Sequence, residues 1–292
     1  SRHFRDRQHI PLTHKQVAFS FWIPETVFRD LHFLDQNAGG LMLVDDPTLH
    51  DERERYVMRS LIEEAITSSQ LEGAATTRAV AKEMLRSGRK PLDHAEKMIY
   101  NNYLTIRRIR ELVDRPLTPE LVRELHGLIA RDTLNDPAQE GRFRTETDGD
   151  IRVYNREGTL LHMPPPVAEI EKSIGLMCSF ANEEQTTGFI HPVIRAILLH
   201  FWLAYLHPFV DGNGRTARAL FYWSMLRKKY WLFEYLSISR VILRAPSQYY
   251  HAFLYSEIDD ADATYFIMFH LQAIREAVED LKFKKGDQWP ES

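Results

Sequence analysis

The 292-residue sequence contains a single cysteine, Cys178, so a framework of internal disulfides is excluded. It also lacks a long hydrophobic run, because the longest uncharged apolar stretch, residues 196–206, is too short to cross a bilayer. The first ten residues, SRHFRDRQHI, hold no apolar signal core. These absences predict a cytoplasmic protein with no membrane association. Cys178 lies on an apolar helical face, which predicts that it is buried and inert.

Positive charge is not in excess either. Lysine and arginine total 37 against 41 aspartates and glutamates, which gives a formal net charge of −4. Such a chain has no global positive field to gather nucleic acid, so nucleic acid is not expected as a partner, although a local basic site is compatible with this total. The composition, 44% hydrophobic and 27% charged, is that of a globular protein with one large core or two smaller domains.

Helical periodicity dominates the chain. Helices are predicted at about 50–71, 77–85, 93–113, 118–131, 167–182, 192–206, 213–229, 246–257 and 264–283. The first forty-odd residues show only a short apolar segment. Residues 135–166 lack helical periodicity. Within them, 151–153 and 161–163 alternate on either side of a turn at 155–158, and three prolines follow at 164–166, which predicts a small β-hairpin. The sequence therefore predicts an all-α protein that carries one hairpin.

The segment 192–206 is apolar nearly all round, which is typical of a helix at the centre of a core. It delivers His207 at its end, where Pro208 discourages continuation. The chain then turns through Asp211-Gly-Asn-Gly214 and enters another helix with apolar residues. A histidine and a glycine-rich turn are thereby held against the core.

This turn has the features of a phosphate site. Gly212 and Gly214 carry no side chains that would block a ligand, and the first N–H groups of the next helix have no internal partner. The helix dipole adds partial positive charge there. Arg215 and Arg218 lie three residues apart on one side of that helix, which suits a polyphosphate better than a single carboxylate.

Two further residues of the turn suit phosphate chemistry. Asp211 could hold Mg²⁺ against the phosphates, because Mg²⁺ takes one or two carboxylates together with phosphate oxygens. His207 is a candidate general base, because its pKa is ordinarily near neutrality. An isolated histidine before proline would be structural far more often than catalytic. Eight defined residues at this spacing, however, coincide by chance only on the order of once in 10¹⁰ starts.

The string His207-Pro-Phe-Val-Asp-Gly-Asn-Gly-Arg-Thr-Ala-Arg218 resembles the motif of the Fic (Fic/Doc) family, HxFx(D/E)GNGRxxR, at every defined position. The resemblance implies a Fic-type helical bundle and a protein adenylyltransferase, a nucleotidyltransferase that moves AMP from Mg-ATP to a protein hydroxyl. His207 would deprotonate that hydroxyl for attack on the α-phosphate, Asp211 would hold Mg²⁺, and Arg218 would engage the γ-phosphate. The phosphates would be cradled by Gly212, Asn213, Gly214 and Arg215.

The resemblance extends more loosely over residues 20–280. It implies an N-terminal extension over 1–115 and a catalytic core over 116–292, with a flap hairpin at 141–166 on which the target protein docks. Tyr250, in a closing helix, is assigned to ATP binding by the same resemblance. A homodimer, the target and the modified residue type stay open.

Glu72 raises a separate question. It continues the stripe of Val57, Leu61 and Ala65, at the helix end where the dipole disfavours a negative charge. A buried carboxylate would require a cation, whereas a frayed helix end would leave Glu72 in solvent. The pattern alone does not decide between the two.

The segment Ser68-Ser-Gln-Leu-Glu72-Gly73 resembles the (S/T)xxxE(G/N) inhibitory motif of Fic proteins. By that resemblance Glu72 pairs with Arg218 in place of the γ-phosphate, so the chain is autoinhibited by its own helix at about 50–72. Ser68 and Gly73 are the other inhibitory residues.

Other functions stay open at this point. Removal of AMP, with Glu72 positioning water, is one, and transfer of another nucleotide or of phosphocholine is a second. A kinase-like relative carries lysine in place of Gly214, which counts against that activity. A non-catalytic interaction module is disfavoured by the intact His207 and Asp211. The remaining histidines, including His126, His191 and His200, show no metal-ligand spacing and are interpreted as core or surface residues.

Overall fold

The computed structural model describes residues 7–39, 50–154, 158–184 and 188–286. In these ranges helices predominate: α1 Glu25–Ala38, α2 His50–Leu71, α3 Arg78–Ser87, α4 His94–Leu112, α5 Pro119–Ala130, α6 Ile170–Ala181, α7 Pro192–Leu206, α8 Asn213–Arg227, α9 Ile238–Ile242, α10 Pro246–Ile258 and α11 Thr264–Gly286. The strands are β1 Gln8–His14, β2 Val17–Phe21, β3 Val153–Tyr154 and β4 Leu160–His162. The predicted all-α class is confirmed. None of the described helices combines the length and the apolar character that crossing a membrane requires.

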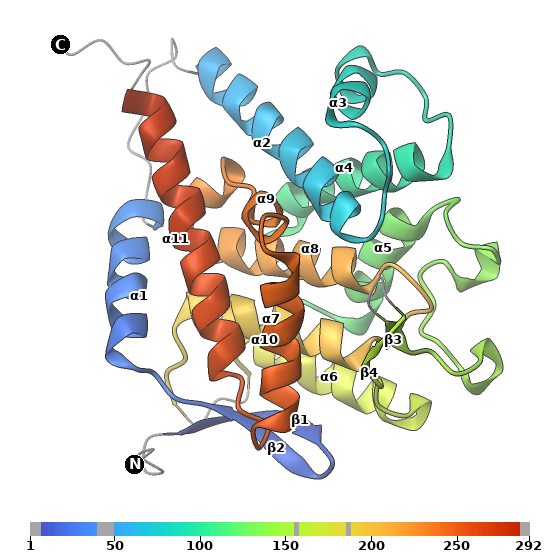
Figure 1. Ribbon diagram of the computed structural model, residues 1–292, viewed down its shortest axis with the longest axis vertical. Coiled ribbons are helices and arrows are strands. Elements are labelled where there is room, and N and C mark those ends of the chain that lie inside the picture. Colours follow the sequence, from blue (N-terminus) through green and yellow to red (C-terminus); the bar gives the residue numbers. More distant parts are fainter. Residues whose placement is uncertain (1–6, 40–49, 155–157, 185–187, 287–292) are drawn as a thin grey trace.

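Helix α7 forms the centre of the main core. Most of its side chains are fully buried, including those of Phe201 and Trp202. It packs chiefly on α8, and both lie behind α10 and α11 in the view of Figure 1. Its apolar surface is covered on all sides, as its sequence predicts. The loop that joins α7 to α8 therefore starts and ends in the buried core.

Helix α2 belongs to a second cluster of buried apolar side chains. It packs against α4 and α3, and Val57, Ala65, Met84 and Ile99 are among the buried members of this cluster. Its bounds, His50–Leu71, agree with the prediction. Figure 1 shows its C-terminal end directed toward α8. The division of the chain at residue 115 stays a prediction.

The predicted small hairpin is present, with strands of two and three residues. β3 pairs antiparallel with β4, with Val153 opposite His162. Residues 155–157, within the predicted turn, lie outside the described residues. His162 anchors the hairpin to the core, because its Nε2 lies 2.6 Å from the Tyr205 carbonyl oxygen and its Nδ1 2.8 Å from Glu257 Oε1.

A second hairpin, β1–β2, was not predicted. Its two-residue turn is Lys15-Gln16, and both residues have positive φ, 47° and 69°. Turns of this kind are ordinarily recognised from Asn or Gly, which adopt positive φ easily, and neither is present here. The short apolar segment that follows the hairpin contains α1, which buries Val27, Leu31 and Leu34.

Helix α9 was not predicted either, because five residues are too few to show a helical periodicity.

Candidate active site

His207 ends helix α7 in an uncommon conformation. Its backbone is left-handed, with φ 48° and ψ 56°, and its N–H donates to the Leu203 carbonyl at 2.9 Å. Pro208 follows and cannot continue the helical hydrogen bonds. A non-glycine residue with such a φ stores strain, which tends to occur at functional sites.

The His207 ring is held as a neutral base. Its Nδ1 lies 3.2 Å from the Ala204 carbonyl oxygen, which can only accept, so Nδ1 carries the proton and Nε2 has the free lone pair. Burial lowers the pKa of His207 to about 4. The imidazole is therefore uncharged at neutral pH and can take a proton at Nε2.

Arg144, which the sequence analysis did not single out, clamps the His207 backbone to the end of the flap. Its Nε donates to the His207 carbonyl at 2.9 Å and its Nη2 to the Pro165 carbonyl at 2.5 Å. Its backbone N–H donates to the Pro208 carbonyl at 2.8 Å. The side chain is buried. No local pattern marks this residue, because its partners are distant in the sequence.

His126 is a buried core residue, as interpreted, and it supports the loop between α7 and α8. Its Nε2 lies 2.9 Å from the Asp211 carbonyl oxygen, and its Nδ1 accepts from the Gly141 N–H at 3.0 Å. The ring stacks on Phe209 with centroids 3.6 Å apart. Burial lowers its pKa to about 4, so the neutral ring both donates and accepts.

The turn itself needs glycine and asparagine for structural reasons. Gly212 has φ +79°, and a Cβ there would come within 3.4 Å of His126 and Ile129. The Asn213 side chain donates to the Phe209 carbonyl and accepts from the Phe209 N–H, each at 2.9 Å. Its amide thus closes the loop, so any phosphate contact would come from the Asn213 backbone.

Two buried arginines stand on the first turns of α8. Arg215 is fully buried and donates from Nη1 to the Ile129 carbonyl at 3.2 Å. Its Nε has no hydrogen-bond partner among the described residues. Burial lowers its pKa, and Asp211 Oδ2 is 3.6 Å from its Nη2. A buried cation that is so weakly paired favours an anion at this position.

Arg218 is held by the end of helix α2. Its Nε donates to Ser68 Oγ at 2.8 Å, and its Nη2 donates to the Ser68 carbonyl at 2.9 Å and to Glu72 Oε1 at 2.7 Å. Burial by itself would lower the pKa of Arg218, but the negative charges of Glu72 and Glu64 outweigh it and raise the pKa. The structure thus joins Glu72 to Arg218.

Glu72 also covers the anion site. It lies just beyond α2, followed by Gly73 at φ +92°, and its side chain is 30% exposed. Its Oε1 occupies the space that a Cβ on Gly214 would take, directly over the N-terminus of α8. Both expected environments are partly realised, because the carboxylate is paired and still reaches solvent. A phosphate at that helix end would meet the Glu72 carboxylate.

Three further buried polar side chains, Tyr249, His200 and His270, lie near Arg218. Tyr249 Oη is 2.9 Å from His200 Nε2, and the His200 and His270 rings lie 4.8 Å apart. Burial raises the pKa of Tyr249 and lowers that of His200 well below its usual range. His200 is a core residue, as interpreted. Tyr250 is half-buried and contacts the Tyr249 ring at 5.5 Å, and its ATP-binding role stays a prediction.

The donor set around Asp211 fits a metal that is shared with a nucleotide. Its carboxylate is 55% exposed at the edge of the loop. The described residues contain no group of three or more histidine, cysteine, aspartate or glutamate side chains that could hold a metal by themselves. One carboxylate with phosphate oxygens and water suits Mg²⁺, which keeps several waters.

These buried histidines predict acid sensitivity. The pKa of His270 is lowered to about 3 and that of His207 to about 4, both by burial, whereas unfolded histidine titrates near 6.5. Below pH 6.5 the unfolded chain binds more protons than the folded chain. The contribution of these neutral rings to the free energy of unfolding is therefore fully present above pH 6.5, and below it falls by up to about 1.4 kcal/mol per group per pH unit. We expect the melting temperature to drop by at least about 5 °C between pH 7 and pH 5.

Thermal melts followed by circular dichroism test this expectation. His270→Leu should make the drop shallower, because one such group is removed, whereas His251→Ala on the surface should leave it unchanged. A melting temperature that stays constant from pH 7 to pH 5 would contradict the assigned neutral state of these rings.

The fold and the loop define a helical protein in which a neutral histidine lies beside a helix N-terminus that carries two buried arginines. Residues 116–225 match the model of the Fic/DOC family. This part of the chain is a Fic/DOC family domain, as its motif predicts.

Its relatives point the same way. Protein adenylyltransferase Fic of Drosophila mojavensis is 26% identical over 231 residues, which cover 76% of this chain and 41% of that protein. Its namesake in Aedes aegypti is 27% identical over 206 residues, which cover 68% of this chain and 38% of that protein. The chain thus spans about two fifths of the length of these curated relatives.

Solved structures share the fold. A Fic family protein from Desulfovibrio desulfuricans G20 matches 97% of this chain and 79% of its own, with a TM-score of 0.72 and 21% identity. Fic-1 from C. elegans matches 89% of this chain and 72% of its own, with a TM-score of 0.67 and 21% identity. At such identities the likeness concerns the fold alone.

Proposed function

We propose that this chain is a protein adenylyltransferase that moves AMP from Mg-ATP to a hydroxyl of a target protein. The single observation that carries the proposal is a neutral His207, with Nε2 unprotonated, beside an anion site walled by Arg215 and Arg218. A base next to a polyphosphate site suits attack of a hydroxyl on phosphorus. Names of the relatives support the same activity.

The reaction assigns one task to each group. The hydroxyl oxygen bonds to the α-phosphorus as its proton passes to His207 Nε2, the bond from that phosphorus to the bridging oxygen breaks, and pyrophosphate leaves. Arg215 and Arg218 hold the phosphates, and the backbone of the Gly212–Gly214 turn approaches them closely. Mg²⁺ held by Asp211 and the phosphates would neutralise charge on the leaving group.

Glu72 is proposed as an inhibitor in the same chain. Its carboxylate occupies both the Arg218 guanidinium and the space over Gly214, where phosphate oxygens would lie. The γ-phosphate of ATP therefore meets the Glu72 carboxylate where it would otherwise meet the Arg218 guanidinium. Ser68 supports this state with two hydrogen bonds to Arg218, and Gly73 provides the positive φ that ends the segment.

The flap is proposed to hold the target. Its strands carry the exposed apolar side chains of Tyr154 and Leu160, and Met163 follows them. The edge of such a hairpin can pair with an extended segment of another protein. Arg144 links that hairpin end to His207, so a bound segment would lie near the base.

Removal of AMP is a second candidate, favoured by one observation. The Glu72 side chain is 30% exposed beside the anion site, so it could position a water for attack on an AMP-modified protein. Here Glu72 would be required rather than inhibitory.

Labelled nucleotide distinguishes these activities. The chain is incubated with Mg²⁺ and ATP that carries label on either the α- or the γ-phosphate, and self-modification serves as the readout. We expect protein-bound label from α-labelled ATP only. Label from γ-labelled ATP alone would show a kinase and overturn the proposal. If a pre-modified chain loses AMP only when Glu72 is present, the second candidate replaces the first.

A further inference from the structure

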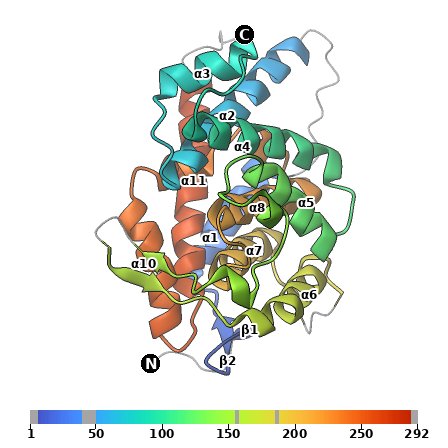
Figure 2. The same cartoon turned by 90° about the vertical axis from the view of Figure 1, so that its right-hand side faces the viewer.

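A cavity of about 510 Å³ lies between α2, α3, α9 and α11, away from the His207 loop. Figure 2 shows α2, α3 and the C-terminal part of α11 at the same end of the molecule. Five of its lining residues are cationic: Arg59, Arg78, Lys82, Arg86 and Arg240. Only two lining residues, Glu63 and Asp280, are acidic. The cavity thus carries three excess positive charges in a chain whose net charge is −4.

Helical spacing concentrates these cations. Arg78, Lys82 and Arg86 are four residues apart and share one face of α3, while Ala81 and Met84 are buried on another. Arg59 adds a charge from α2, and Arg240 adds one from α9. Three separate helices, α2, α3 and α9, thus direct positive charge into one space.

The two carboxylates are already engaged. Glu63 pairs with Arg78 and lies 3.6 Å from Lys82, and Asp280 is 2.6 Å from Arg240. Arg59 and Arg86 have no carboxylate partner within the part of the chain that the structure describes. Arg59 lies over the Tyr56 ring at 5.7 Å, and both arginines are exposed and accessible to a solute.

We propose that this cavity is a second anion site, which binds a phosphate-bearing small molecule with at least two negative charges. Its volume lies in the range of small-molecule sites, roughly 300–1,000 Å³. Guanidinium groups bind phosphate oxygens in pairs, and Arg59 and Arg86 are free to do so. Tyr56 and Tyr235 line the same cavity and offer rings to an aromatic part of the ligand.

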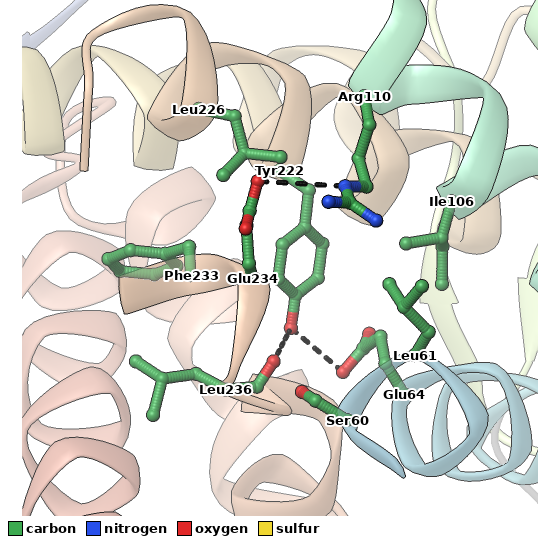
Figure 3. A pocket seen from close by; sticks show the side chains of 10 residues that line it. All are labelled: Ser60, Leu61, Glu64, Ile106, Arg110, Tyr222, Leu226, Phe233, Glu234 and Leu236. Atoms are coloured by element: carbon green, nitrogen blue, oxygen red, sulfur yellow. Dashed lines mark hydrogen bonds and ion pairs between the residues drawn. The ribbon is translucent and has the colours of Figure 1, made fainter. Parts of the chain in front are cut away.

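The cavity adjoins the contact that seats α2 on the core. Ser237, which lines it, donates to the buried carboxylate of Glu64 at 2.8 Å, and Tyr222 donates to the same carboxylate at 2.9 Å. Figure 3 shows Glu64 and Tyr222 beside a smaller cavity of about 10 Å³. Because Glu64 and Ser68 are one turn apart, a ligand that bridges α2 and α9 would steady the segment that holds Arg218.

The consequence for catalysis rests on the proposed function, but binding does not. Inorganic tripolyphosphate is the probe, titrated by calorimetry into the wild type, Arg59→Glu/Arg86→Glu and the control Arg107→Glu. Arg107 is exposed and lies over the Tyr103 ring at 5.7 Å, as Arg59 lies over Tyr56, but it is not among the lining residues. Both variants should melt like the wild type, because Arg59, Arg86 and Arg107 form no ion pair with any residue that the structure describes.

We expect a binding component in the wild type and in Arg107→Glu that weakens at least tenfold in the double variant. Hydrogen exchange should show amides of α2 and α3 protected by tripolyphosphate in the wild type and not in the double variant. Equal binding by all three proteins would place the probe at the His207 loop and overturn the proposal, as would a wild type that does not bind it.

Discussion

Replacing Glu72 by glycine is expected to raise AMP transfer on the order of 10- to 100-fold. The substitution removes the carboxylate that pairs with Arg218 at 2.7 Å and that lies over Gly214. Restoring one charge-assisted contact to the γ-phosphate corresponds to about 1.4–2.8 kcal/mol. Transfer is measured as label from α-labelled ATP on the chain itself.

Gln70→Gly is the matched control for this change. Gln70 lies in the last turn of α2, so glycine there loosens the same helix end without touching Arg218. It should leave transfer near the wild-type rate. The inhibitory role of Glu72 is contradicted if Glu72→Gly transfers no faster than wild type, or if Gln70→Gly activates equally.

Replacing His207 by alanine should lower transfer by about 10² to 10⁴-fold, the usual contribution of a positioned general base. The measurement belongs in the Glu72→Gly background, where activity is highest. Because the pKa of His207 is lowered to about 4, the ring is already neutral at pH 6, so transfer should not fall between pH 8 and pH 6.

His251→Ala, a substitution of an exposed histidine, controls for general effects of losing an imidazole. Circular dichroism shows whether each variant keeps its helices. A His207→Ala protein that is folded and transfers AMP within a few-fold of its parent would exclude His207 as the base. If the transfer rate instead falls as the pH is lowered through about 6.5, the His207 ring is solvated rather than buried.

Local sequence pattern was sufficient for the elements that organise the site. The apolar helix α7, the glycine turn and the two arginines all follow from spacing within one short segment. The bounds of α2 follow from its period and from Gly73. The hairpin β1–β2 could not be predicted, because Lys15-Gln16 adopts positive φ without the residues that ordinarily announce it.

Contacts between distant segments account for what the sequence left out. Arg144 and His126 hold the motif loop through partners that are 63 and 85 residues away. The environment of Glu72 was equally undecidable from its own helix, because burial and pairing depend on where α8 lies. The basic cavity likewise exists only once four helices are brought together.

The central claim is that Arg218 is shared by two anions, the γ-phosphate and Glu72. The most direct measurement compares ATP and ADP binding by calorimetry in His207→Ala and in His207→Ala/Glu72→Gly, where no turnover interferes. We predict that removing Glu72 tightens ATP binding at least tenfold and leaves ADP binding unchanged, because only ATP has the phosphate that competes. Equal gains for ATP and ADP, or no gain for ATP, would contradict the claim.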